Sequence, residues 1–258
     1  MENKTLELFR GCALAVERAI SGYDVTTRRK TVGMGADGTP TSEIDKMAED
    51  TAISYLAENS DHGVMSEEIG IVEGKGDGIV IMDPIDGTSN ALNGIPFYSI
   101  SLALTNNGFS DISVGYVKNL PMGKEYYAVK GKGSYADGIR LPSLPDNPEL
   151  NFSVYMGLKA HPESIRIASL ARRTRSLGSA SLEMCMVAEG VFHLYYIVTL
   201  DRERSLRITD IAASTLILRE AGGEVYMSPW DTLDMELDVS ARRDVIAVKD
   251  DSVRKVIE

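Results

Sequence analysis

The octapeptide Asp83-Pro84-Ile85-Asp86-Gly87-Thr88-Ser89-Asn90 directly follows the apolar run Gly78-Ile79-Val80-Ile81-Met82. The apolar run predicts a buried strand. Pro84 has a fixed φ and no N–H group, so we expect the strand to end there and the chain to turn. Asp83 and Asp86 can then point to one place beyond the strand. Two carboxylates that close are costly unless a cation lies between them. Carboxylate oxygens suit Mg²⁺ and backbone N–H groups at a helix start suit a phosphate, so the stretch predicts a metal-dependent phosphate site.

The composition is that of a soluble globular protein without a nucleic-acid partner. The 258 residues suffice for one compact unit or two tightly joined domains. A net charge of −11 argues against nucleic acid, and the apolar runs are too short for a membrane span or a signal peptide. Cys12 and Cys185 fall in apolar helical patterns, which predicts reduced core thiols and a cytoplasmic location. The three histidines share no spacing, so we expect no metal ligation by them.

The first half of the chain combines two helices with several strands. Apolar residues at helical spacing predict a helix over 3–21, and a second helix begins at Ser42, with Asp45 at a capping-box position. The glycine-rich segment 28–41 predicts a loop. Strands are expected near 78–83, 97–104, 112–117 and 125–129. Two helices followed by strands are typical of an α+β arrangement.

The segment 142–148 carries three prolines and is the best domain boundary. It divides the chain into an α+β domain over 1–142, with most of the candidate metal ligands, and an α/β domain over 143–258, with Asp210 and substrate contacts. In the second half, strands and helices alternate, which is typical of α/β structure. Strands are expected at 151–156, 191–199, 224–227 and 244–248, and helices at 162–173, 179–189, 208–221 and the C-terminus.

Five elements, which follow one another along the chain in the order found in the family, resemble those of the inositol monophosphatase family of Mg²⁺-dependent phosphatases. The octapeptide resembles the family signature, and the loop around residues 35–45 resembles that of the archaeal fructose-1,6-bisphosphatase/inositol-1-monophosphatase type. The resemblance implies a layered α-β-α-β-α sandwich. In two elements Ser66, Thr209 and Ser214 replace residues usual in the family, which affects packing more than chemistry. The other elements are Met65-Ser66-Glu67-Glu68, Arg175-Ser176-Leu177-Gly178-Ser179-Ala180 and Thr209-Asp210-Ile211-Ala212-Ala213-Ser214.

The resemblance also implies a set of metal ligands. Asp83 would bridge two Mg²⁺ ions, with Glu67 and the Ile85 carbonyl on the first and Asp86 and Asp210 on the second. Asp37 would help to hold a third, weaker ion, and Mn²⁺ is a candidate substitute. Without the resemblance, simpler interpretations stand. A Glu-Glu pair is usually a solvated turn, an aspartate often caps a turn or helix, and Asp-Gly is often an exposed turn. For Asp45, capping alone is a sufficient explanation.

The reaction implied is hydrolysis of a phosphomonoester by direct in-line attack of a metal-activated water. Glu67 and Thr88 would hold this water, and no covalent nucleophile is needed. The favoured substrates are fructose-1,6-bisphosphate, at its 1-phosphate, and inositol-1-phosphate. Another sugar phosphate or a nucleotide-derived ester stays an alternative, and we expect a homodimer. The expected substrate contacts are Asp86, Gly87, Thr88, Ser89, Arg175, Gly178, Ser179, Ala180, Arg202, Arg204, Arg207 and Asp210.

Arginines flank two of these elements, and the guanidinium fork matches phosphate geometry. We expect two or three of the six to contact the substrate. Two rival classes fit less well: a haloacid-dehalogenase-type phosphotransferase needs Asp-x-Asp near the N-terminus, and a Ca²⁺-binding module needs a twelve-residue acidic loop. The chain could also be a metal-binding protein without catalytic activity, and only a measurement of turnover excludes that class. The arginines are Arg172, Arg173, Arg175, Arg202, Arg204 and Arg207.

Overall fold

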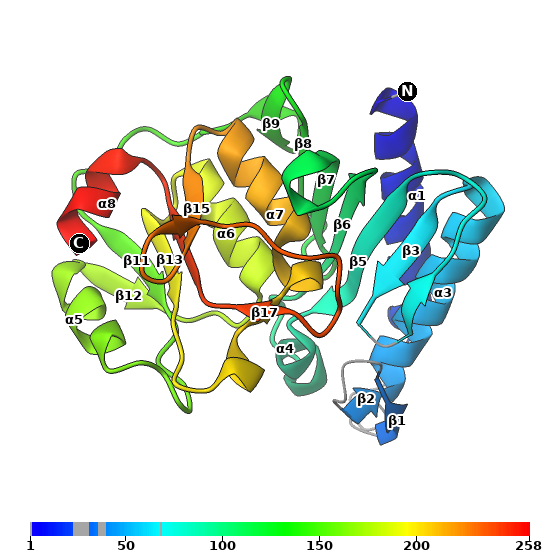
Figure 1. Ribbon diagram of the computed structural model, residues 1–258, viewed down its shortest axis with the longest axis horizontal. Helices are drawn as coiled ribbons and strands as arrows, with labels where there is room; N and C mark the ends of the chain where they lie inside the picture. Colours follow the sequence, from blue (N-terminus) through cyan, green and yellow to red (C-terminus); the bar gives the residue numbers. More distant parts are fainter. Residues whose placement is uncertain (1, 23–30, 36–39, 68) are drawn as a thin grey trace.

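The chain folds into five layers, in which two β-sheets alternate with three layers of helices (Figure 1). The computed structural model describes residues 2–22, 31–35, 40–67 and 69–258. Helices α1 and α3 cover the outer face of the first sheet, and α6 and α7 fill the space between the sheets. Helices α5 and α8 cover the outer face of the second sheet. This arrangement confirms the predicted α-β-α-β-α sandwich.

The first sheet has eight strands in the order β10-β9-β8-β7-β6-β5-β3-β4, and every pair is antiparallel except β3 with β5. Helices on both faces bury the inner strand β5 almost throughout, which explains its continuous apolar run. The strands are β3 Gly63–Ser66, β4 Gly70–Val72, β5 Ile79–Asp86, β6 Ser99–Thr105, β7 Ile112–Asn119, β8 Glu125–Val129, β9 Gly133–Ala136 and β10 Ile139–Arg140. The outer helices are α1 Glu2–Ile20 and α3 Glu43–Asn59.

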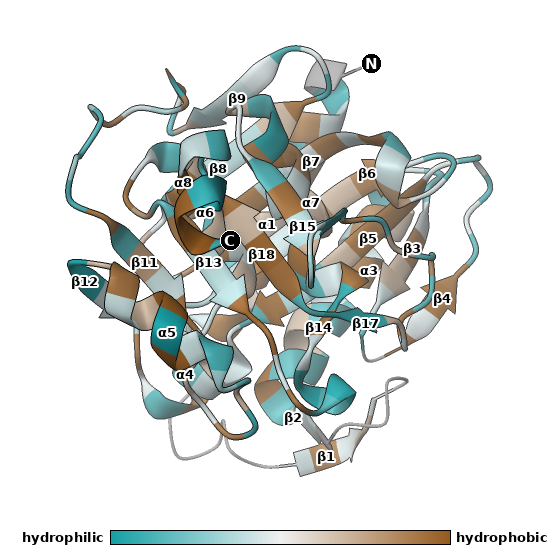
Figure 2. Ribbon diagram, turned by 60° about the vertical axis from the view of Figure 1, so that its left-hand side comes forward, coloured by the Kyte–Doolittle hydropathy of each residue, from teal (hydrophilic) through white to brown (hydrophobic). Residues whose placement is uncertain are grey.

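The second sheet has six strands in the order β12-β11-β13-β18-β15-β16, parallel from β12 to β13 and antiparallel beyond. Its strands are β11 Asn151–Val154, β12 Arg173–Arg175, β13 Leu194–Ile197, β15 Glu224–Met227, β16 Asp231–Thr232 and β18 Val245–Val248. Its helices are α5 Glu163–Leu170, α6 Ala180–Glu189, α7 Ile208–Glu220 and α8 Asp251–Ile257. Figure 2 shows apolar residues concentrated on the strands and on the helices packed between the sheets.

Several short elements complete the chain. Two-stranded ladders pair β1 with β2 and β14 with β17, and both are antiparallel. These elements are β1 Thr31–Met34, β2 Pro40–Ser42, α4 Thr88–Asn93, η1 Phe109–Asp111, η2 Arg202–Arg204, β14 Leu206–Arg207 and β17 Arg242–Arg243. None of the helices in the described ranges combines the length and the apolar character needed to cross a bilayer.

Helix α7 is the central helix of the molecule, and all its residues from Ile208 to Leu218 are buried. A helix buried on every side is expected to be mostly apolar, and the buried residues of α7 are so except for Thr209, Asp210, Ser214 and Thr215. It lies unusually close to the first sheet: a Cβ on Gly115 of β7 would fall 2.7 Å from the carbonyl oxygen of Ala213. Gly115 and the small residue Ala213 therefore let this helix pack closely against β7, which helps to fix the position of Asp210 in its first turn.

Three predictions about local structure were wrong. Residues 31–34 of the predicted loop form β1 and residues 40–41 belong to β2, whereas residues 28–30 and 36–39 lie outside the described part. The predicted helix 162–173 ends at Leu170, because residues 173–175 instead pair with β11. Strand β5 does not end at Pro84 but continues to Asp86. The register of its pairing with β6 shifts between Asp83 and Asp86, so Pro84, which has no N–H group, lies where the regular pairing is interrupted.

The predicted boundary 142–148 falls between β10, which ends the first sheet, and β11, which begins the second in sequence. One apolar core nevertheless joins residues of both sheets through α6 and α7. The division into two domains stays a prediction. Cys12 and Cys185 are free, buried thiols, as predicted.

Candidate active site

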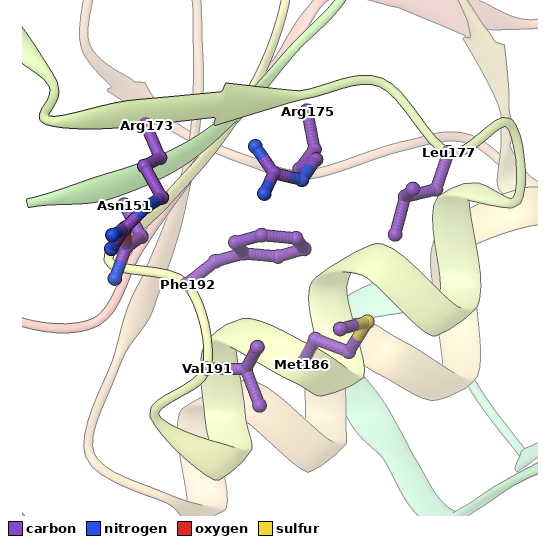
Figure 3. A pocket seen from close by; sticks show the side chains of 7 residues that line it. All are labelled: Asn151, Arg173, Arg175, Leu177, Met186, Val191 and Phe192. Carbon is purple, nitrogen blue, oxygen red and sulfur yellow. The ribbon is translucent and has the colours of Figure 1, made fainter.

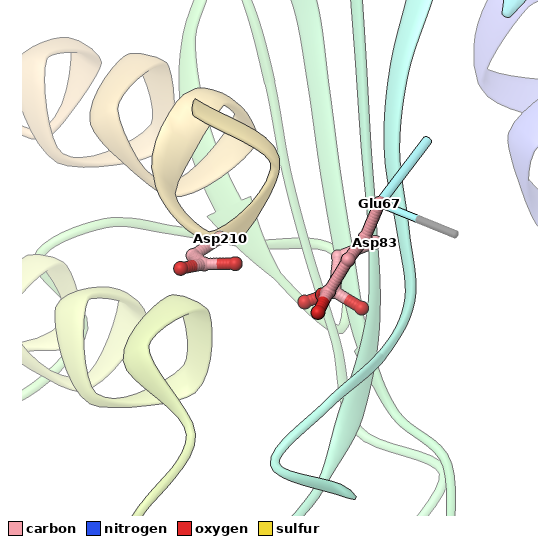
Figure 4. Close-up of side chains that lie close together, drawn as sticks. All are labelled: Glu67, Asp83 and Asp210. Carbon is pink, nitrogen blue, oxygen red and sulfur yellow. The ribbon is translucent and has the colours of Figure 1, made fainter. Parts of the chain in front are cut away.

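Three carboxylates meet at the end of the first sheet, and their closest oxygens lie within 4.8 Å of one another (Figure 4). Glu67 directly follows β3 and Asp83 lies in β5. Because these strands are parallel and Ser66 is paired with Met82, the two acids are neighbours. Asp210 comes from the opposite side, in the first turn of α7. All three were predicted from the sequence as metal ligands. The fold brings them together although Glu67 and Asp210 are 143 positions apart in the sequence (210 − 67).

Burial and mutual repulsion make this cluster costly in its ionised form. Burial raises the pKa of the Asp83 carboxyl well above its ordinary value, and the neighbouring charges of Glu67, Asp86 and Asp210 raise it further. Burial also raises the pKa of Asp210, against the opposing effect of Arg207. A divalent cation would remove this repulsion, and an all-oxygen donor set suits the hard ions Mg²⁺, Ca²⁺ and Mn²⁺. The residues present therefore fit a divalent metal.

Arg207 lies against this acidic cluster. Its Nη1 is 2.9 Å from Oε1 of Glu67 and 3.9 Å from Oδ1 of Asp210. Its backbone N–H donates to Oδ2 of Asp210 at 2.8 Å, so Asp210 also caps the start of α7. The simpler interpretation of Asp210 as a helix-start residue is thus correct as well. The guanidinium supplies part of the positive charge that the acids require.

Thr88 connects the turn after β5 to helix α3. Its Oγ1 lies 3.0 Å from Oδ1 of Asp45 and 3.1 Å from the carbonyl oxygen of Ile85. Ser42 donates from Oγ to the second oxygen of Asp45 at 2.6 Å, in the predicted N-cap. Burial raises the pKa of Asp45. Capping is therefore not a sufficient explanation for Asp45, because its Oδ1 accepts from the hydroxyl of Thr88, outside the cap.

Asp86 lies beside the cluster and is held by the start of α6. One of its oxygens accepts from the hydroxyls of Ser179 at 2.6 Å and Ser181 at 2.5 Å and from the Ser181 N–H at 2.8 Å. The other accepts from the Ala180 N–H at 3.2 Å, which leaves lone pairs for a further ligand. Burial and the charge of Asp210 raise the pKa of Asp86 to about 6. Ser179 and Ala180, predicted as substrate contacts, thus position Asp86, whose role as a metal ligand stays a prediction.

The loop before α6 is fixed against the turn after β5. Gly87 has φ of 94°, and a Cβ there would lie 3.0 Å from the carbonyl oxygen of Gly178. Asn90 donates from Nδ2 to the Leu177 carbonyl at 2.7 Å. The buried carboxylate of Glu183 accepts from the N–H groups of Leu177 at 2.8 Å and Gly178 at 3.0 Å. The sequence alone did not identify Asn90 and Glu183 as residues that position this loop. An acid four residues after Ser179 was the signal for Glu183, though it is equally typical of any helix start.

Comparison with known proteins decides the family. The model of the inositol monophosphatase family matches residues 3–250. The chain belongs to the inositol monophosphatase family. It is 36% identical to a fructose-1,6-bisphosphatase/inositol-1-monophosphatase of Archaeoglobus fulgidus, over 100% of this chain and 98% of that relative. A Methanothermobacter thermautotrophicus protein of the same name is also 36% identical, over 96% of this chain and 94% of the relative. The predicted resemblance is confirmed, and the protein is a phosphatase.

Solved structures agree with this assignment. A structure described as an inositol monophosphatase-fructose 1,6 bisphosphatase superposes with a TM-score of 0.85 and 30% identity, over 97% of both chains. A Pyrococcus horikoshii protein described as having similarities for inositol-1 monophosphatase gives a TM-score of 0.81 at 26% identity, again over 97% of both. The layered fold of this phosphatase is therefore the fold of its family.

The arginines that flank the site in sequence have very different places in the phosphatase. Arg172 and Arg173 pair with Glu149, at 3.8 Å and 3.4 Å. Arg175 lies over Phe192 in a pocket of about 440 Å³ whose remaining walls are largely apolar (Figure 3). Of the six, only Arg207 is shown in contact with the acidic cluster among the described residues. Arg202, Arg204 and Ser89 are exposed, and Asp37 lies outside the described residues.

Proposed function

We propose that this phosphatase is a Mg²⁺-dependent phosphomonoesterase that hydrolyses fructose-1,6-bisphosphate at its 1-phosphate and inositol-1-phosphate. The observation that carries the proposal is the convergence of Glu67, Asp83 and Asp210 beside the Thr88–Asp45 pair. Relatives at 36% identity that bear both activities in their names support the choice of substrates. Mg²⁺ is favoured because the site offers carboxylate oxygens and a phosphate ester would complete it.

The metal would be held by the three clustered carboxylates, together with the Ile85 carbonyl and Asp86. When bound there, Mg²⁺ would acidify the attacking water and offset the negative charge that develops on the phosphoryl and leaving oxygens. The chain's own contribution begins with Thr88. A hydroxyl that donates its hydrogen to Asp45 keeps its lone pairs free to accept the proton of the attacking water.

Asp45 is suited to receive that proton. Its burial raises its pKa, which makes the carboxylate a better base than an exposed aspartate. Glu67 would hold the same water from the other side. The turn at Gly87, kept against Gly178, would present the backbone of Gly87 and Thr88 to the phosphate. This scheme needs no covalent phosphoenzyme.

A second candidate function is hydrolysis of a nucleotide ester. The chain is 33% identical to a protein of Methanococcus maripaludis named bifunctional NADP phosphatase/NAD kinase, over 98% of this chain and 48% of that protein. A Methanocaldococcus jannaschii protein of the same name is 35% identical over 84% of this chain. The 2′-phosphate of NADP is therefore included among the test substrates.

Phosphate release from four esters tests these proposals: fructose-1,6-bisphosphate, inositol-1-phosphate, NADP and glucose-6-phosphate. We expect release from the first two, loss of release in EDTA and recovery with Mg²⁺, with Mn²⁺ as a partial substitute. Asp210→Asn should remove nearly all turnover, whereas the exposed control Asp111→Asn should retain it. Turnover that persists in EDTA, or release from NADP alone, contradicts the proposal. A phosphoenzyme trapped by acid quench would contradict direct attack by water.

Two further predictions concern the protein in solution. We propose a homodimer, because the pocket beside Arg175 leaves the apolar side chains of Leu177, Met186 and Val191 partly exposed. Light scattering during gel filtration tests this, and a monomer over the micromolar range would contradict it.

We also propose that the phosphatase acts in the cytoplasm, which the two buried thiols support.

A further inference from the structure

Three serine hydroxyls from two different parts of the fold gather around the buried carboxylate of Asp86. Ser99 is the first residue of β6 and is paired with Asp86 of β5 in the first sheet. Ser179 directly precedes α6, and Ser181 lies in the first turn of that helix. The exposed fraction of each serine is 1% or less. Because water does not reach these hydroxyls, their hydrogen bonds must be made within the protein.

The close donors of this cluster all fall on one oxygen of Asp86. Oδ2 accepts from the Ser179 hydroxyl at 2.6 Å, from the Ser181 hydroxyl at 2.5 Å and from the Ser181 N–H at 2.8 Å. The bond to Oδ1, from the Ala180 N–H, is longer, at 3.2 Å. An oxygen with three close donors has no lone pair left for another ligand. Oδ1 is therefore the oxygen that Asp86 can offer to a cation.

Ser99 acts on Asp86 through the other serines. Its Oγ lies 2.8 Å from Oγ of Ser181 and 3.2 Å from Oγ of Ser179, but 3.5 Å from Oδ2 of Asp86. A hydroxyl has one hydrogen, and Ser181 gives its hydrogen to the carboxylate, so Ser99 must be the donor in the 2.8 Å bond. A hydroxyl that accepts a hydrogen bond also becomes a stronger donor. The chain of bonds from Ser99 through Ser181 thus holds Oδ2 toward the start of α6.

The number of oxygens that a carboxylate offers bears on the choice of cation. Mg²⁺ demands nearly ideal octahedral geometry with short bonds, whereas Ca²⁺ accepts about six to eight oxygens in flexible geometry. Ca²⁺ can take both oxygens of one carboxylate as ligands. A carboxylate that is limited to one oxygen therefore suits Mg²⁺ and withholds a ligand from Ca²⁺.

We propose that Ser99 and Ser181 set the selectivity of the metal centre for Mg²⁺ over Ca²⁺ by holding Oδ2 of Asp86 away from the ion. The proposal rests on the phosphatase function and the metal centre proposed above. Neither serine was predicted from the sequence as a site residue. Both are positioning residues, because they act through Asp86. If the hydroxyls served only to stabilise the start of α6, their loss would leave the relative affinity for the two ions unchanged.

Displacement of bound Mn²⁺ by Mg²⁺ or by Ca²⁺ tests the proposal without turnover, with free Mn²⁺ measured by electron paramagnetic resonance. The ratio of the Ca²⁺ midpoint to the Mg²⁺ midpoint measures selectivity, and any change in Mn²⁺ affinity cancels from it. We expect this ratio to fall at least about tenfold in the double variant Ser99→Ala with Ser181→Ala, since that is the scale of one charge-assisted hydrogen bond. Each single variant should lower it at least about threefold, so the test does not depend on the folding of the double variant.

Two further variants separate the hydroxyls from general effects of substitution. Ser181→Thr keeps the hydroxyl and should keep the wild-type ratio. The matched control is Ser164→Ala, which removes a fully buried hydroxyl from α5, on the outer face of the second sheet. Its ratio should also stay at the wild-type value.

Crystals soaked in Ca²⁺ provide a second measurement. In the double variant both oxygens of Asp86 should lie within about 2.3–2.6 Å of the ion, and in the wild type Oδ1 alone. An unchanged midpoint ratio in the serine-to-alanine variants, or a wild-type Asp86 that binds Ca²⁺ through both oxygens, would overturn the proposed selectivity and leave the phosphatase function intact. A wild-type protein that binds no Mn²⁺ and releases phosphate from none of the test esters would refute the proposed function itself, and the selectivity with it.

Discussion

Replacing Asp83 by asparagine should stabilise the metal-free protein and at the same time remove its turnover. Asp83 is buried, and the carboxylates of Glu67, Asp86 and Asp210 all oppose its ionisation. Its Oδ1 accepts the Ile85 N–H at 2.9 Å, a bond that the carbonyl oxygen of asparagine can keep. The amide nitrogen can donate to a neighbouring carboxylate. The substitution thus exchanges repulsion for a hydrogen bond without changing the shape of the side chain.

The neighbouring Asp86 gives the scale of the effect. Its pKa is raised from 3.8 to about 6, and about two units correspond to about 3 kcal/mol for an ionised carboxylate in these surroundings. The pKa of Asp83 is raised in the same direction, by burial and by the charges of Glu67, Asp86 and Asp210. Removing an unfavourable buried charge, less the cost of burying a partly satisfied amide, typically changes stability by a few kcal/mol, and we expect Asp83→Asn to gain about 2 kcal/mol at pH 8 on this general scale. For a chain of this size, that raises Tm by about 4–8 °C.

Thermal unfolding at pH 8, in EDTA and in saturating Mg²⁺, measures this prediction. In EDTA the variant should unfold above the wild type. In Mg²⁺ the order should reverse, because the metal stabilises only the protein that binds it. Asp111→Asn is the control, because this exposed carboxylate is paired with Lys130 and its loss should raise Tm in neither condition. A variant no more stable than the wild type in EDTA, or equally stabilised by Mg²⁺, would refute the reasoning.

Three further outcomes are expected. The folded-state pKa of Asp86, about 6, exceeds the ordinary value of 3.8, so its contribution to stability is present below about pH 4 and is lost as pH rises through about 6. Urea unfolding in EDTA should therefore show lower stability at pH 8 than at pH 5, and a flat profile would contradict this. Thr88→Val should lower kcat by about 10²-fold or more, whereas the Mg²⁺ affinity measured by calorimetry should change little. Thr88→Ser should retain most turnover. A near-normal kcat in Thr88→Val would exclude proton transfer from the water through Thr88 to Asp45. Gly87→Ala should lower the free energy of unfolding in urea by about 1–3 kcal/mol and should lower kcat, because φ is 94° and the new Cβ would lie 3.0 Å from the Gly178 carbonyl oxygen. Gly94→Ala is the control: its φ is 71°, no atom lies near the new Cβ, and it should lower the free energy of unfolding less.

Long, strongly patterned elements were predictable from the sequence, and elements set by pairing were not. The apolar run before Asp83 predicted β5, and the helical spacing of apolar residues predicted α1 and α7 within one or two residues. The end of α5 was missed, because residues 173–175 have no strand pattern of their own and become a strand only by pairing with β11. Pro84 failed as a strand end because the irregular step of the ladder accommodates its missing N–H.

The site shows the same division between local and long-range information. Glu67, Asp83 and Asp210 were found because each belongs to a short motif, and the parallel pairing of β3 with β5 then brings two of them together. The contact between Thr88 and Asp45 joins residues 43 positions apart, and it depends on how α3 is rotated against the first sheet. No local pattern contains that rotation. The place of Arg242 near Asp210 depends likewise on the ladder between β14 and β17, which joins distant segments.

The most direct test of the account is the position of a metal ion in crystals of the protein grown with Mn²⁺, located from its anomalous scattering. We predict an ion at about 2.0–2.2 Å from carboxylate oxygens of Glu67, Asp83 and Asp210, and no such signal in crystals of Asp210→Asn grown in parallel. An ion bound elsewhere, with these three carboxylates uncoordinated, would contradict the metal centre on which the proposed chemistry depends.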